Sequence, residues 1–198
     1  MAYTVAVRVT WDRAKNLANQ KKHGISFEEA SVLFRSGVEY LERFDDDHSD
    51  DEDRFIAIGP IRRGLVMVVW TERDGDVVRI ISARWATRNE QALFRSYIQE
   101  ADMTDMPELT RRDFARAIPA SVRRRLMQGR FESGDDIAAL RRFVGLTQAR
   151  FARAMGISVH TLRNWEQDRR SPEGPAIALL RIAARHPRIL RENLKTAA

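Results

Sequence analysis

Residues 54–84, "RFIAIGPIRRGLVMVVWTERDGDVVRIISAR", contain three short apolar runs that are separated by turn residues. The runs RFIAIG, GLVMVVW and DVVRIISAR are rich in β-branched residues, which is typical of strands. Between them lie PIRRG and the pair Asp74-Gly75, the second of which is a hairpin signal. The stretch therefore predicts an antiparallel meander of three strands.

The flanking sequence adds one strand and three helices. Alternating apolar residues at 3–9 predict a strand. Residues 12–24 predict a helix between an aspartate N-cap and a glycine, and residues 26–34 predict a second helix with a Ser-x-x-Glu capping box. A Thr-x-x-Glu box opens a closing helix at 87–99. Since residues 42–54 are too acidic for regular structure, we expect a loop there, and the predicted order is β-α-α-β-β-β-α in an α+β domain.

The rest of the chain is helical in pattern, without strand-like alternation. Short helices are predicted over 135–194, and they make this part an all-α domain. The apolar positions at helical spacing, which we expect to be buried, are Ile137, Leu140, Val144, Phe151, Met155, Leu162, Trp165, Ile177, Leu179, Leu180 and Ile182.

Net charge changes sign near residue 102. Residues 1–102 hold 15 Lys and Arg against 18 Asp and Glu, while residues 103–198 hold 19 against 10. The basic half has the charge expected of a nucleic-acid binder. We predict a first domain at 1–102, a linker at 103–134 and a second domain at 135–198. Met103 and Met106 lie at the change and suggest a former start of a second gene, although an ordinary linker explains them as well.

Composition excludes several classes of site. With no cysteine there is neither a disulfide framework nor a thiolate metal ligand, and we expect a reducing cytoplasmic location. No apolar run is long enough for a membrane span. The acidic stretch around His48 lacks the spacing of a calcium loop, so we expect no metal and no cofactor.

Three blocks in the first half carry a resemblance to a known family. The blocks are "WDRAKNLANQKKHGISFEEA" (11–30), "DHSDDEDRFIAIG" (47–59) and "VRIISARWATRNE" (78–90). They resemble, in the same order, the signature blocks of the BrnT family of bacterial toxins. The resemblance implies a RelE-like fold and a ribonuclease that arrests growth until an antitoxin neutralises it.

RNA cleavage without a metal needs a base for the ribose 2′-OH, cations on the phosphate and an acid for the leaving oxygen. Arginine suits the phosphate, and histidine side chains titrate near neutral pH. The candidates are Lys22, His23, His48, Glu52, Arg54, Arg79 and Arg84, of which the three arginines form the expected clamp. The identity of the base stays open. Equally, Arg79 can simply face solvent, and Lys22 and His23 can simply complement a helix dipole.

Residues 147–167, "TQARFARAMGISVHTLRNWEQ", resemble the XRE/Cro-like helix-turn-helix. Its second helix enters the major groove, so the exposed positions of that helix read bases and neighbouring cations contact phosphates. The expected DNA-binding residues are Gln148, Ser158, Val159, His160, Thr161, Arg163, Asn164, Arg169 and Arg170. The alternative is a solvated helical hairpin that binds no nucleic acid.

Together the halves predict a toxin and its antitoxin in one polypeptide, either a natural or an engineered fusion. BrnT toxins usually pair with a ribbon-helix-helix antitoxin, so the neutralising mode does not carry over. We expect Phe114, Ile118, Val122 and Leu126 to cover the toxin, within or between chains, on two short helices because Pro119 interrupts one.

Operator binding predicts a homodimer. The ribonuclease would be silent in the fused chain. The alternative is a transcription regulator whose RelE-like domain serves only dimerisation.

Overall fold

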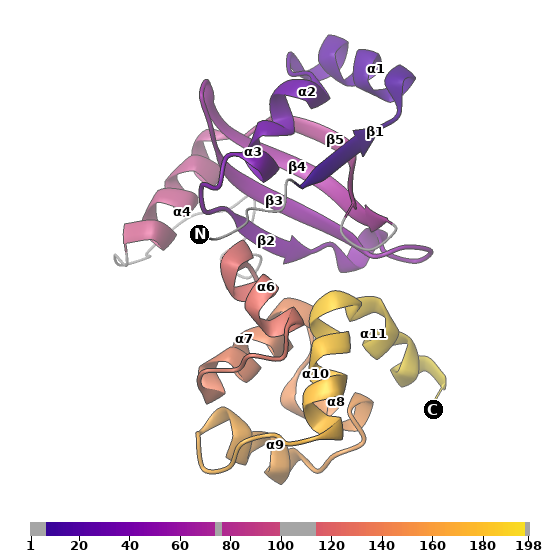
Figure 1. Ribbon diagram of the computed structural model, residues 1–198, viewed down its shortest axis with the longest axis vertical. Coiled ribbons are helices and arrows are strands. Elements are labelled where there is room, and N and C mark those ends of the chain that lie inside the picture. Colours follow the sequence, from indigo (N-terminus) through magenta and orange to yellow (C-terminus); the bar gives the residue numbers. More distant parts are fainter. Residues whose placement is uncertain (1–6, 74–76, 100–113, 197–198) are drawn as a thin grey trace. The chain divides into compact units, whose positions relative to one another are not determined.

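A computed structural model describes residues 7–73, 77–99 and 114–196 of the chain (Figure 1). The predicted turn at Asp74-Gly75 and the paired methionines within 100–113 lie outside the described residues. Within the described part, no helix is long and apolar enough to cross a membrane. Contacts divide the chain into two compact units, 1–42 with 54–114 and 43–53 with 115–198.

A mixed sheet with the strand order β1-β5-β4-β3-β2 organises the first unit. The strands are β1 (Arg8–Trp11), β2 (Leu41–Phe44), β3 (Arg54–Ile61), β4 (Gly64–Arg73) and β5 (Val77–Trp85), and the short strand β6 (Ile118–Pro119) belongs to the second unit. The pairs β3–β4 and β4–β5 are antiparallel, and β1 runs parallel to β5. The three-stranded meander and the α+β class are thus confirmed.

The stretch 42–54 differs from the predicted loop, because its first residues belong to strand β2. In β2, Leu41 and Phe44 are buried, and this apolar contribution offsets the acidic residues that follow. A single 3₁₀ turn, Asp46–His48, comes next.

The capping signals of the first unit behave as predicted. Helix α1 (Arg13–His23) begins at Asp12, whose carboxylate accepts a hydrogen bond from the backbone N–H of Lys15 at 2.8 Å, and it ends at Gly24 with φ 68°. The hydroxyl of Ser26 accepts from the N–H of Glu29 at 3.1 Å. The second predicted helix is divided into α2 (Phe27–Ala30) and α3 (Val32–Arg35). At the break, the hydroxyl of Ser31 donates to the carbonyl of Glu28 (2.7 Å), a local bond that competes with the helix ladder.

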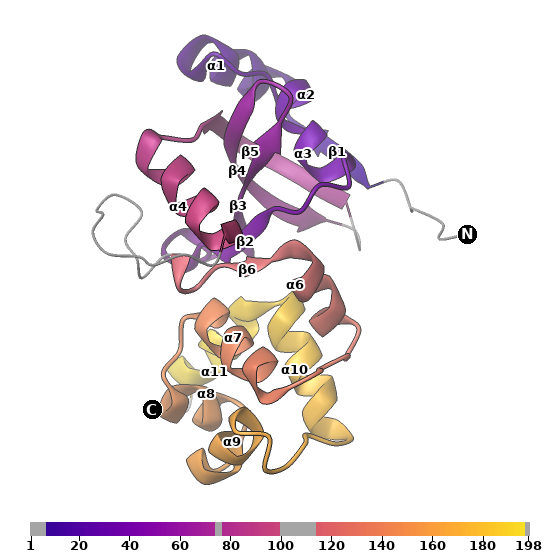
Figure 2. The same ribbon diagram turned by 90° about the vertical axis from the view of Figure 1, so that its left-hand side faces the viewer.

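One sheet face carries the core of the first unit. Phe55 and Trp70 are opposite in register, with ring centroids 5.0 Å apart, and Phe34 of α3 meets Trp70 edge-on at 5.6 Å. A Cβ at Gly59 would come within 2.6 Å of Leu33, so the missing side chain lets α3 approach β3. Figure 2 shows α3 and α4 (Arg88–Gln99) on opposite sides of the sheet.

Asn19 of α1 completes the edge of β5. Strand β1 pairs with β5 only as far as Trp11 opposite Ile80, which leaves the edge beyond it without a strand partner. There the Asn19 carboxamide accepts from the N–H of Ala83 (3.1 Å) and donates to its carbonyl (2.8 Å). A buried side chain thus replaces a missing strand and ties α1 to the sheet.

Within the described residues, six α-helices build most of the second unit. They are α6 (Ala120–Met127), α7 (Gly134–Val144), α8 (Gln148–Ala154), α9 (Val159–Glu166), α10 (Pro175–Arg185) and α11 (Pro187–Thr196). Phe143, Phe151, Leu162 and Leu180 are fully buried at their centre. The predicted burial of Leu179 and Ile182 is wrong: they are 39% and 40% exposed, because α10 turns only its Leu180 and Ala183 side inward.

Two arginines of α6 attach that helix to its neighbours. Buried Arg123 donates to the carbonyls of Ala184 (3.0 Å) and Arg185 (3.3 Å) and so caps the C-terminus of α10. Arg125 forms a bidentate pair with Asp136 of α7 at 2.6 and 2.7 Å. Burial by itself would raise the pKa of Asp136, but the hydrogen bonds from Arg125 and from the backbone N–H of Glu132 outweigh it, and the pKa is lowered.

We expect Asp136→Asn to lower the free energy of unfolding by about 2 kcal/mol at neutral pH, because the charge-assisted bonds to Arg125 are lost. A lowered folded-state pKa contributes stability that is complete above the unfolded-state pKa and disappears as pH falls through the folded value. Urea denaturation over a pH series measures this. Asp135→Asn, at an exposed position of the same helix turn, is the control. The free energies of unfolding of wild type and variant should converge as the pH falls. If their difference stayed constant down to the lowest pH where both fold, ionised Asp136 would not be the source of the stabilisation.

Candidate functional site

A row of polar residues crosses one sheet face of the first unit. Thr71 of β4 lies between Arg54 of β3 and Arg79 of β5, directly opposite each of them. On the other side of β5, Thr10 of β1 lies opposite Arg79. Directly opposed residues share a face, so the two arginines flank Thr71 at about 10 Å between their backbones, which is two strand spacings. Arg79 is exposed and Arg54 is half-buried. The structure thus brings two of the three expected clamp arginines together.

Arg84, the third expected clamp residue, has another partner. Its guanidinium donates to both carboxylate oxygens of Glu90 at 2.6 and 2.7 Å. Glu90 is 2% exposed and also accepts from the N–H of Thr87 (2.8 Å), so it caps α4 as predicted. Burial alone would raise the pKa of Glu90, but Arg84 and Thr87 more than compensate and lower this pKa. Arg84 therefore joins the end of β5 to the beginning of α4.

The titratable candidates lie elsewhere. Lys22 and His23 occupy the last turn of α1, and in the described part of the chain neither is joined to the arginine row by a hydrogen bond or ion pair. His48 and Glu52 belong to the segment 43–53 of the second unit. The His48 ring lies with Nδ1 3.1 Å from each carboxylate oxygen of Asp45. Among the described residues, no group of three or more possible ligands could hold a metal ion.

Helices α8 and α9 form the predicted helix-turn-helix. Thr147 caps α8 by accepting from the N–H of Arg150 (3.3 Å). Gly156, with φ 67°, makes the turn, and the N–H of Ile157 returns to the carbonyl of Ala152 at 3.0 Å. Ser158 then caps α9 by accepting from the N–H of Thr161 at 2.9 Å.

One side of α9 is left for a ligand. Leu162 and Trp165 turn inward, and the opposite arc holds His160, Arg163, Asn164 and Gln167, of which Asn164 is half-buried and the others are exposed. Gln167 is absent from the predicted set, although it follows His160 by seven residues, two helical turns. The hydroxyls of Ser158 and Thr161 are instead bonded to each other at 2.8 Å.

Glu166 is the centre of a polar network that positions this arc. Its carboxylate accepts from Nε of Arg141 on α7 (2.6 Å) and from Nε2 of Gln148 on α8 (2.6 Å). The other amide atom of Gln148, Oε1, accepts from Nε of Arg163 at 3.3 Å. Gln148, which we expected to contact phosphate, is therefore also a support for the Arg163 side chain.

The C-terminal end of α9 rests on Gly134. Any Cβ there would collide with the backbone of Trp165 and Glu166, so only glycine allows α7 to begin so close. The N–H of Gly134 donates to Oδ1 of Asp168 (2.6 Å), and Asp168 itself has φ 55°, a left-handed conformation that aspartate tolerates.

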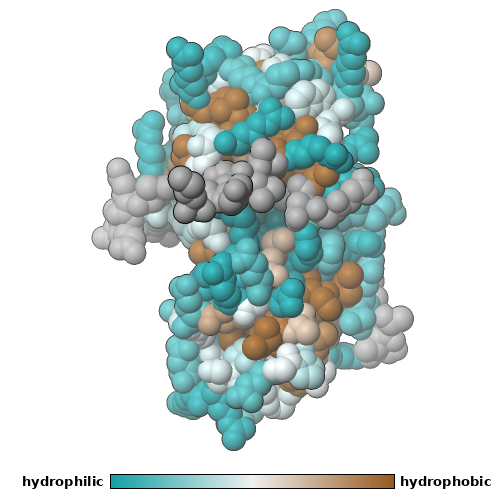
Figure 3. Space-filling model, viewed as in Figure 1, coloured by the Kyte–Doolittle hydropathy of each residue, from teal (hydrophilic) through white to brown (hydrophobic). Residues whose placement is uncertain are grey.

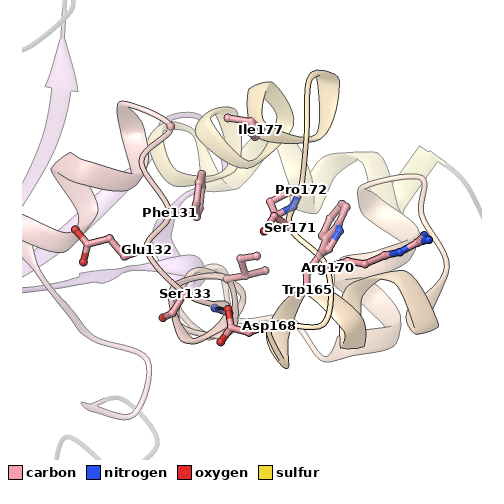
Figure 4. Close-up of a pocket in the computed structure, with 12 residues that line it drawn as sticks. Phe131, Glu132, Ser133, Trp165, Asp168, Arg170, Ser171, Pro172 and Ile177 are labelled. Atoms are coloured by element: carbon pink, nitrogen blue, oxygen red, sulfur yellow. Dashed lines mark hydrogen bonds between the residues drawn. The ribbon is translucent and has the colours of Figure 1, made fainter.

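Figure 4 shows the hollow beside this junction, lined in part by Phe131, Trp165 and Asp168. At about 110 Å³ it is well below the size of a ligand pocket, so we assign it no ligand. The junction fixes the loop that carries Arg169 and Arg170, both of which are exposed.

Comparisons with known proteins match each half separately. Residues 11–90 match the family described as "Ribonuclease toxin, BrnT, of type II toxin-antitoxin system", and residues 137–181 match the helix-turn-helix family. A curated relative, Antitoxin HigA-2 of Vibrio cholerae serotype O1, is 41% identical over 58 residues, 29% of this chain. The chain spans 56% of the length of that relative.

A crystal structure of the Brucella abortus ribonuclease toxin BrnT is similar at 21% identity, covering 42% of this chain and 100% of that one. With a TM-score of 0.32, this likeness adds nothing to the family matches. The first half of the chain is thus similar to a family of ribonuclease toxins, and the second half is similar to helix-turn-helix proteins. In particular, residues 11–90 resemble the BrnT family, and a 58-residue stretch resembles the antitoxin HigA-2.

We expect Arg84→Ala to destabilise the protein by about 3 kcal/mol, because it leaves the buried Glu90 carboxylate without its cation. Arg79→Ala, at an exposed position of the same strand, should change stability by less than about 0.5 kcal/mol. Chemical denaturation of the full chain compares the two. Equal losses would show that Glu90 does not depend on Arg84.

For the helix-turn-helix, we expect Arg163→Ala to reduce affinity for a selected DNA site by about 1–3 kcal/mol and to relax preference at one base pair. Arg169→Ala should weaken binding to all sequences and lower the salt slope by about one unit. Fluorescence anisotropy over a salt series measures both. Arg124→Ala, an exposed position of α6, controls for loss of one positive charge. Unchanged preference in Arg163→Ala would remove this residue from the reading set.

Proposed function

We propose that the chain is a type II toxin and its antitoxin in one polypeptide. The BrnT-like domain is a metal-independent endoribonuclease, and the C-terminal domain binds operator DNA, represses its own operon and silences the ribonuclease. The observation that carries this proposal is the pairing, on one chain, of a BrnT match at 11–90 with a helix-turn-helix at 137–181.

The arginine row supports the ribonuclease part. Arg54 and Arg79 present two permanent positive charges on one sheet face, which suits a polyanionic backbone. In the proposed reaction they stabilise charge on the scissile phosphate. The base that takes the 2′-OH proton comes from Lys22, His23, His48 or Glu52, and an acid protonates the leaving 5′-oxygen.

The exposed arc of α9 supports the DNA-binding part. His160, Arg163, Asn164 and Gln167 are donors or acceptors of the kind that read base edges in the major groove. Arg169 and Arg170 follow the helix as exposed cations for phosphates.

A homodimer would present two such helices to a palindromic operator. Its proposed contact is the apolar surface of Leu179, Ile182 and Ile189, which are 39–42% exposed. Brown patches around α10 and α11 in Figure 3 show apolar side chains at that surface.

The alternative function, a transcription regulator with a non-catalytic RelE-like dimerisation domain, also has an observation in its favour. Arg84 is bound to Glu90 and His48 to Asp45, so two catalytic candidates already have partners. In that case the domain would bind its own copy and cleave nothing.

Expression of residues 1–102 alone distinguishes the two functions. A free ribonuclease domain should arrest bacterial growth and cleave RNA, whereas the full chain should do neither. No arrest and no cleavage by a folded 1–102 fragment would exclude the ribonuclease.

In that fragment Arg79→Ala should restore growth and reduce the cleavage rate by roughly 100-fold, the scale of one preorganised charge contact. Arg62→Ala removes an equally exposed arginine from the β3–β4 turn and should leave growth arrest intact. Equal rescue by both variants would mean that net charge, and not the arginine row, is responsible.

A further inference from the structure

The segment Arg43–Asp53 connects β2 and β3 within the BrnT-matching region, yet it packs as part of the helical unit. It holds seven acidic side chains and one arginine. Such a density of like charge is unfavourable unless cations surround it. Basic residues of the helical unit meet it at two points.

The first point is Asp46, which receives three guanidinium groups. Arg116 lies 2.9 Å from its carboxylate, Arg191 of α11 lies 3.2 Å away, and Arg43 of the segment itself lies 3.5 Å away. The Asp46 side chain is only 12% exposed, so solvent and salt screen these contacts weakly.

Hydrogen bonds to backbone carbonyls position both Arg116 and Arg191 for this contact. Arg116 donates through Nε to the carbonyl of Arg142 (3.3 Å), and Arg191 donates to the carbonyl of Val144 (3.1 Å). These carbonyls end α7, so the two cations complement its dipole as well. Gly145 follows with φ 77°, and a Cβ there would collide with Arg116. The glycine therefore leaves the space in which the cations converge.

The second point is Asp53, at the beginning of α11. Its Oδ1 accepts from the backbone N–H of Arg188 (3.0 Å), and its Oδ2 lies 3.3 Å from Nδ1 of His186. A carboxylate that accepts from the first turn of a helix acts as an N-cap and meets the positive end of the dipole. Asp53 thus caps a helix that lies 135 residues further along the chain.

We propose that Arg43–Asp53 is the recognition element by which the helical region captures the BrnT-like domain. This rests on the proposed function, in which the helical region is the antitoxin. The capturing residues are Arg116, His186, Arg188 and Arg191. None of them belongs to the exposed arc of α9, so capture and DNA reading use separate surfaces. Two catalytic candidates, His48 and Glu52, lie inside the captured segment, which links capture to silencing.

The test uses the full chain with a protease site inserted after residue 106. After cutting, the affinity between the two halves is measured by biolayer interferometry over a salt series. The wild-type halves should bind each other, and their affinity should fall as salt rises. Asp46→Ala with Asp53→Ala should raise the dissociation constant by roughly 30-fold, the effect of removing one partner of a desolvated charge pair.

The matched control is Asp47→Ala with Asp51→Ala, which removes the same charge at exposed positions of the same segment. It should change the dissociation constant by less than about threefold. Asp53→Asn keeps a capping oxygen and should fall between the two. A cycle of Asp46→Ala with Arg191→Ala should show non-additive losses, as directly paired groups do.

Equal effects of the two double variants, additive losses in the cycle, or wild-type halves that do not associate would each overturn the proposal. Thermal melting of the uncut variants identifies any that fail to fold. In that case the dissociation constant of Asp53→Asn or of Arg191→Ala is compared with that of the wild-type halves instead. Since the readout is affinity, it is independent of RNA cleavage. Capture without any ribonuclease activity would retain this inference and exclude the toxin function.

Discussion

A carboxylate removed from water must be met by a cation, and that requirement determines how the main elements of this chain join. Glu90 ties helix α4 of the BrnT-like domain to strand β5 through Arg84. Glu166 holds α9 against α7 through Arg141. Asp46 brings basic side chains from both ends of the helical region to one point. In each case the carboxylate is nearly buried. Its cation must therefore lie at one defined position, because water cannot take its place.

The same requirement changes the meaning of the arginine excess. A net charge of +6 invites the conclusion that the basic side chains serve nucleic acid. Arg123 instead caps a helix from a buried position, and Arg125 neutralises a buried aspartate. What is left for a ligand is a smaller and more ordered set, chiefly Arg79 on the sheet and Arg163 on the reading helix. Charge composition indicates a partner, but burial decides which charges can reach it.

Local signals made much of the fold predictable. Capping boxes act over three residues and strands over five to ten, so Ser26, Thr87 and the three-stranded meander could be recognised directly. Contacts between residues far apart in the chain have no comparable local pattern in the sequence. The partner of Arg84 depends on how β5 meets α4, and β2 is too short for its two apolar residues to stand out beside seven acids. The spacing of apolar residues in α10 also predicted burial of Leu179 and Ile182, but the neighbouring helices cover only the Leu180 side.

The cap on α11 has a consequence for how the two halves depend on each other. Asp53 is synthesised long before the helix that it completes, so the capping group of α11 already exists when that helix leaves the ribosome. On one polypeptide, tethering gives the two an effective concentration on the order of millimolar. At that effective concentration, ion pairs and one capping bond keep the contact formed at a lower affinity than two separate proteins would need. Joining the two halves in one chain lowers the affinity that their contact needs.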